Sequence, residues 1–117
     1  MANWTAATLR NRVLERLGVK GRGQSAAAED AQAVDDLWVS LYEQLLAEEH
    51  APFTSGAVPE WAQQPLVKML AGEAAPLFGF HGERLVEHAV AANEGRTELQ
   101  RQTTGKKGRT PIRGNFL

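Results

Sequence analysis

The side chains that could act as nucleophiles, bases or metal ligands are mainly three serines and three histidines. Ser25, Ser40 and Ser55 lie in none of the contexts that expose a catalytic serine on a nucleophile elbow. His81 and His88 could share one helix face, but two imidazoles without a third ligand do not define a zinc site. These residues predict neither a catalytic centre nor a metal site.

Two further patterns imitate functional motifs. Residues 18–23 read GVKGRG, but this segment follows a predicted helix instead of a strand and lacks the Lys-Ser or Lys-Thr ending of a phosphate-binding loop. Glu48 with Glu49, or Glu83 with Glu87, could be read as an acid and base pair, but such pairs are common on helix surfaces. We therefore predict no bound cofactor and no enzymatic activity.

Charge is segregated along the chain although the formal net charge is only -1. Residues 1–24 hold five bases and one acid, residues 25–50 hold seven acids and no base, and the last fifteen residues hold four bases and no acid. Such blocks can be solvated helix faces, or they can pair neighbouring copies of the chain. For the second case the predicted inter-subunit pairs involve Arg10, Arg12, Arg16, Asp35, Asp36 and Glu43.

Hydrophobic periodicity predicts an all-α fold, a small bundle of about four helices. The first helix is expected over residues 6–17, with Thr5 as N-cap, Trp4 and Leu9 as a hydrophobic staple and Gly18 as C-cap. The second is expected from residue 26 to about residue 49, with Ser25 as its N-cap. Its predicted core face holds Val34, Leu37, Trp38, Leu41, Leu45 and Leu46.

Prolines and glycines delimit the remaining helices. Pro59 suits the first position of a third helix, in which Pro65 is expected to introduce a kink and which ends near Pro76 and Gly79. Its predicted apolar face holds Trp61, Leu66, Met69, Leu70, Ala74 and Leu77. A fourth helix follows Gly82; because its apolar residues are concentrated early, its later half is expected to stand clear of the core.

The chain is predicted to comprise a helical domain over residues 1–102 and an extended basic C-terminal arm over residues 103–117. The arm has no acid, and its glycines and proline favour an extended segment that folds only against a partner. There is no cysteine, and no apolar run is long enough to span a membrane. The first residues lack the pattern of a signal peptide, so we expect the protein to be cytosolic where it is made.

A nucleic-acid-binding role is the alternative that the composition leaves open. The bases between Arg10 and Arg22, together with the arm, could neutralise phosphates. The acidic second helix and a sequence pI near 6.3 oppose such binding.

Four short segments give the sequence a resemblance to a known family. Residues 9–19 read LRNRVLERLGV, residues 33–38 read AVDDLW, residues 58–62 read VPEWA and residues 75–79 read APLFG, and an Arg-rich arm ending in Phe116 and Leu117 follows. In this order they resemble the head-tail adaptor, or head-completion, proteins of tailed phages and gene transfer agents, which include the portal-docking tail accessory factor of short-tailed phages.

The resemblance implies a non-enzymatic virion protein at the portal vertex, at the interface between head and tail, which is present in the host cytoplasm during assembly. Copies would form a ring of about twelve subunits on the portal protein, continue the channel for genomic DNA without sequence-specific contacts, and offer an attachment surface to a tail, nozzle or stopper protein. It also implies that the arm binds the portal. The residues expected to do so are Lys106, Lys107, Arg109, Pro111, Ile112, Arg113, Phe116 and Leu117.

Overall fold

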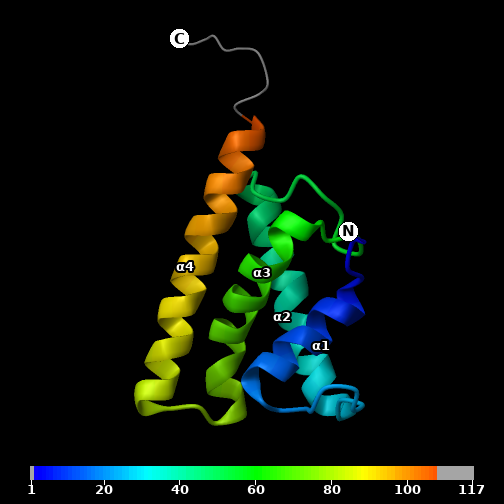
Figure 1. Cartoon of the computed structure of the whole chain (residues 1–117), viewed down its shortest axis with the longest axis vertical. Helices are drawn as coiled ribbons and strands as arrows, with labels where there is room; N and C mark the ends of the chain where they lie inside the picture. The colour runs from blue at the N-terminus through cyan, green and yellow to red at the C-terminus, as the bar shows by residue number, and fades with distance from the viewer. Residues whose placement is uncertain (1, 108–117) are drawn as a thin grey trace.

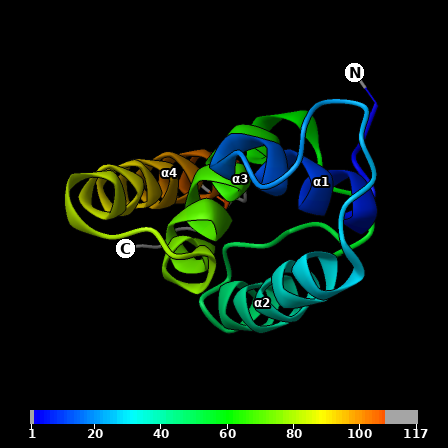
Figure 2. The same ribbon diagram turned by 90° about the horizontal axis from the view of Figure 1, so that it is seen from below.

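A computed structural model describes residues 2–107 of the chain as an all-α bundle. Its elements are α1 (Ala6–Leu17), α2 (Ala28–Ala47), α3 (Glu60–Ala74), a 3-10 turn η1 (Ala75–Phe78) and α4 (Gly82–Lys107). Helix α3 lies between α4 on one side and α1 on the other, and α2 lies across the bundle from them (Figures 1 and 2). The predicted all-α class is confirmed.

Helix α1 has the predicted bounds and caps. The Thr5 side chain accepts a hydrogen bond from the Thr8 amide, and Gly18 ends the helix in the left-handed region with φ of 75°. One face buries Leu9, Val13, Leu14 and Leu17. Before the helix, the backbone of Trp4 exchanges two hydrogen bonds with that of Val58, which joins the segment before α1 to the segment before α3.

Helix α2 begins later than the sequence predicts. Its N-cap is Ala27, which makes no side-chain cap hydrogen bond, so the prediction that Ser25 caps this helix is wrong. Alanines fill positions 26–28, and because each tolerates both helical and extended backbone, the sequence does not fix which residue starts the helix. The other end is closed by Glu49 at φ of 63°, with the His50 amide donating to the Leu45 carbonyl at 2.8 Å.

Helix α3 is the central element and buries residues along most of its length, among them Leu66, Met69 and Leu70. Pro59 was predicted as the first helical residue but is instead the N-cap, so α3 begins one position later; Pro65 lies inside the helix. Leu77, predicted for its apolar face, is instead 61% exposed in η1. The change from α-helix to 3-10 turn at Ala75 rotates that side chain away from the core.

Helix α4 differs most from the prediction. Its early apolar residues Val86 and Val90 are 60% and 53% exposed, whereas Leu99 and Thr103 in its later half are fully buried. The expectation that the later half stands clear of the core is therefore wrong. Two glycines explain the packing: a Cβ on Gly72 would lie 2.4 Å from the Ala92 Cβ, and one on Gly95 would lie 2.6 Å from the Pro65 carbonyl oxygen. Without side chains there, α3 and α4 approach closely.

The predicted boundary at residues 102 and 103 falls inside α4, which continues to Lys107. Thr103 Oγ1 lies 2.8 Å from His50 Nδ1 and donates to the Gln100 carbonyl at 3.1 Å. Since its own hydrogen is used on Gln100, Thr103 accepts from the imidazole. The first residues of the predicted arm therefore belong to the helical domain and join α4 to the end of α2.

Candidate functional site

A groove of about 470 Å³ runs between α1 and α2 on the molecular surface. Helix α2 contributes side chains one turn apart, and α1 contributes two alanines and an arginine. The lining residues are Ala6, Ala7, Arg10, Asp35, Trp38, Val39, Tyr42, Glu43, Leu46 and Ser55. Most of the lining is apolar, and it includes Val39 and Leu46, which are 58% and 49% exposed.

The local sequence explains why the groove is open. Ala6 and Ala7 open α1 with the smallest helical side chains, so the two helices leave a hollow that larger residues would fill. On α2, residues 35, 39, 42 and 46 recur at three- and four-residue spacing and therefore lie along one face. Beyond Asp35, the side chains of Val39, Tyr42 and Leu46 form an apolar strip along α2 that α1 leaves partly uncovered.

Aromatic residues fix one wall of the groove. Trp38 Nε1 donates to the Ser55 carbonyl at 3.2 Å, and the Tyr42 hydroxyl donates to the Phe53 carbonyl. The rings of Trp38 and Tyr42, of Tyr42 and Phe53, and of Phe53 and Trp61 have centroids 5.4, 6.1 and 5.8 Å apart. This chain of rings holds the loop before α3 against α2, and Phe53 in that loop packs against the core.

The rim of the groove is charged. Arg10 Nη1 lies 3.3 Å from Asp35 Oδ2, and this pair crosses from α1 to α2 with 24% and 37% of the two side chains exposed. Glu43 on the same rim is exposed. Helix α2 as a whole carries five acids and no base, so the surface beside the groove is acidic even after Asp35 is paired.

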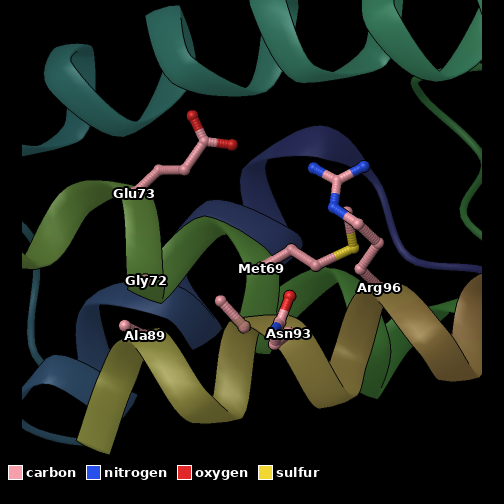
Figure 3. Close-up of a pocket in the computed structure, with 7 residues that line it drawn as sticks. Met69, Gly72, Glu73, Ala89, Asn93 and Arg96 are labelled. Atoms are coloured by element: carbon pink, nitrogen blue, oxygen red, sulfur yellow. The ribbon is translucent and has the colours of Figure 1, made fainter. Parts of the chain in front are cut away.

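A smaller hollow of about 220 Å³ lies between α3 and α4 (Figure 3). Glu73, Asn93 and Arg96 are its polar lining residues, and Gly72 and Ala89 form apolar parts of its wall. Arg96 Nη1 is 3.6 Å from Glu48 Oε1, which links α4 to the end of α2. Because its arginine is engaged in this pair, we assign the hollow a packing role.

Some of the residues predicted to pair between subunits form ion pairs within the chain instead. Besides the Arg10–Asp35 pair, Arg12 Nη1 lies 3.1 Å from Glu15 Oε1, and Arg12 Cζ lies over the Trp4 ring, 5.6 Å from the ring centroid. Arg16, Asp36 and Glu43 remain on the surface without an ion pair to any other described residue. These three are the members of the predicted set that stay open to a second copy.

The N-terminal bases also pair with their own helix. Lys20 Nζ lies 3.2 Å from Glu15 Oε2, and the hydrogen bond from Lys20 is the main reason why the pKa of the Glu15 carboxyl is lowered. Arg16 and Arg22 are exposed. The cluster that the nucleic-acid alternative requires is therefore smaller in the structure than in the sequence.

The histidines and serines form no candidate catalytic group. The rings of His88 and Phe80 pack edge to face with their centroids 4.9 Å apart. Burial, followed by the charges of Arg16 and Arg84, lowers the pKa of the His88 imidazole below 6.5. His81 is exposed, and His50 bonds to Thr103. Within residues 2–107, no cluster of three or more histidine, aspartate or glutamate side chains could hold a metal ion.

The predicted portal-binding arm is only partly within the described residues. Lys106 and Lys107 are in the last turn of α4. Arg109, Pro111, Ile112, Arg113, Phe116 and Leu117 lie outside the described residues.

No described helix is long and apolar enough to cross a lipid bilayer.

The groove itself was not predicted from the sequence. Trp38 and Leu46 were assigned to the core face of the second helix, whereas Leu46 is half exposed at the groove, and Val39 was not singled out. The available signal was the apolar residue Val39 beside that face, opposite two alanines at the start of α1.

Comparisons with family models, with curated proteins and with solved structures gave no match.

Proposed function

We propose that this chain is a structural head-tail connector of a tailed phage or gene transfer agent, and that copies assemble as a ring on the portal protein. The proposal rests on the resemblance of four sequence segments and the basic arm to that family. It assigns the chain no enzymatic activity and places it at the portal vertex of the virion. Its partners are the portal, a tail, nozzle or stopper protein, and further copies of itself.

The observation that carries the proposal is the exposure of apolar side chains on two different helices. Val39 and Leu46 are exposed at the α1–α2 groove, and Val86 and Val90 lie one turn apart on α4. Apolar surface that gathers in this way on a small domain is typical of faces that are covered in an assembly. A connector requires such faces, because each subunit contacts two neighbours.

The test is the mass, by light scattering, of the portal ring from the same genome mixed with this chain. One sample contains the full chain, and the other contains a version that ends at Lys107. Ending it at Lys107 keeps the buried Thr103 and all of α4. The proposal expects many copies of the full chain on each portal ring and few or none of the shorter version.

One result would reject the connector assignment, and another would reject only the role of the arm in portal binding. If neither version adds mass to the portal, the connector assignment fails. If both versions add the same mass, the chain is a connector whose arm is not the portal-binding element. Circular dichroism of both proteins shows beforehand whether the shorter version keeps its helices.

Nucleic-acid binding is kept as the second candidate because of one observation. Arg16 of α1 and Arg84 of α4 both lie close enough to His88 to lower its pKa, so bases from two helices gather at one end of the bundle. Binding to duplex DNA that falls steeply with salt, and that is lost in an Arg16→Gln/Arg84→Gln variant, would support this candidate. Negligible binding at physiological salt would reject it.

A further inference from the structure

We propose that the C-terminal segment of this chain, residues 108–117, docks into the α1–α2 groove of the same molecule. In this state Ile112, Phe116 and Leu117 cover the exposed apolar strip of α2, and Arg109 and Arg113 face the acids beside it. The inference goes beyond the connector role and does not depend on it, because it concerns the free chain.

The groove has the features of a site for a short peptide. It is concave, about 470 Å³ in volume, and its two aromatic side chains, Trp38 and Tyr42, are already held in place by ring contacts with each other and with Phe53. Val39 and Leu46 keep about half of their surface in water. Covering those two side chains is favourable, and a wall that is already ordered adds little entropic cost to binding.

The C-terminal segment has the complementary composition. Residues 108–117 read GRTPIRGNFL, with two arginines, no acid and three large apolar side chains. Helix α2 carries Asp36 and Glu43 on its surface without an ion pair to another described residue, and it has no base. A basic and apolar peptide therefore matches the apolar floor of the groove and Glu43 on its rim, where Arg10 is already paired with Asp35.

The connection is short enough for docking within one chain. Thr103 of α4 bonds to His50, which follows the last turn of α2, and Leu46 at the near end of the groove belongs to that turn. The α2 part of the lining, from Asp35 to Leu46, is about 17 Å long at 1.5 Å per residue. Ten extended residues can reach about 35 Å, which is enough to enter the groove and follow it.

Cross-linking tests the proposal cleanly because the chain contains no cysteine. The full chain is made with Val39→Cys and Asn115→Cys together and treated with a short bismaleimide. The matched control carries Ser40→Cys with Asn115→Cys. Ser40 is also exposed, is one residue further along α2, and does not line the groove, so the tether to the tail is nearly the same.

We expect intramolecular cross-linking of the Val39→Cys chain to be about tenfold faster than that of the Ser40→Cys chain, since docking raises the local concentration of the tail above that of a free tether. Equal rates for the two chains would overturn the proposal. A product with twice the chain mass as the main species would also overturn it, because the occupant would then be the tail of another copy.

A second pair of variants tests whether the difference in rate depends on a local disturbance of α2 by the Val39→Cys or Ser40→Cys substitution. Leu46→Cys lines the groove and Ala47→Cys does not, and the same difference in rate is expected. In the Val39→Cys/Asn115→Cys chain, adding Arg109→Glu and Arg113→Glu should bring the rate down to the control value. A rate that stays high after this charge reversal would contradict the charge complementarity on which the docking rests.

Discussion

Replacing Gly95 with alanine tests whether the close approach of α3 and α4 holds the bundle together. A Cβ at this position would lie 2.6 Å from the Pro65 carbonyl oxygen and 3.1 Å from the Lys68 Cβ. The carbonyl belongs to the backbone of α3 and cannot rotate away as a side chain can. Alanine at residue 95 therefore requires the two helices to move apart.

Two opposing effects set the size of the change. Alanine is favoured over glycine inside a helix by about 1 kcal/mol. Separating the helices by about 0.5–1 Å forfeits a quarter to a half of each affected van der Waals contact, and overpacking of this kind generally costs about 1–3 kcal/mol. With a cost of about 2 kcal/mol, we expect Gly95→Ala to lower the free energy of unfolding by about 1 kcal/mol.

The assay is urea denaturation followed by far-UV circular dichroism. Glu87→Ala and Glu87→Gly form the control pair, because Glu87 is exposed on the same helix and does not line the α3–α4 hollow; the glycine variant should be about 1 kcal/mol less stable than the alanine variant. If Gly95→Ala instead gains as much as this pair differs, propensity alone decides the outcome, and the close packing inferred at Gly95 is refuted.

Three further changes are predicted from single contacts. Glu49 has a φ of 63°, a left-handed conformation that glycine adopts without strain. Glu49→Gly should therefore be about 1 kcal/mol more stable than Glu49→Ala, which removes the same side chain but keeps the strain. Equal urea midpoints for the two variants would contradict this. Thr103→Val removes the buried hydroxyl that accepts from His50 and should cost about 1–2 kcal/mol in the same assay, whereas Thr104→Val at an exposed position should cost almost nothing. Because the pKa of His88 is lowered, the unfolded chain binds more protons than the folded chain just below pH 6.5. The melting temperature should therefore fall as the pH is lowered through about 6.5 and level off below the folded pKa. His88→Gln should flatten that part of the profile, and a profile that it leaves unchanged would exclude His88 as the cause.

The parts of the fold that the sequence predicts well are those decided by local chemistry. The bounds of α1 follow from Thr5, Gly18 and a regular apolar face, and all of these act within one or two turns. The start of α2 was wrong because Ser25 is followed by alanines that give no preference for one starting residue. Local signals predict an element only when neighbouring positions differ in what they allow.

The exposure of α4 could not be predicted by counting its apolar residues. Val86 and Val90 suggested a buried early half, but burial is decided by where α3 can approach, and Gly72 and Gly95 determine that. The groove was missed for a related reason. Its hollow arises where Ala6 and Ala7 of α1 lie opposite Val39 of α2. Small side chains on one helix predict a groove only when the helix that packs opposite them is known.

The two proposals together give an order of assembly. Helices α4 and α1 lie on opposite sides of α3, so the Val86 and Val90 side chains and the α1–α2 groove belong to different parts of the surface (Figure 2). Contact between unlike faces of identical subunits is the heterologous arrangement that closes into rings. If the C-terminal segment occupies the groove of the free chain, one of these faces is covered and the chain remains monomeric. Binding of that segment by the portal would uncover the groove, so the ring would form only where a portal is present.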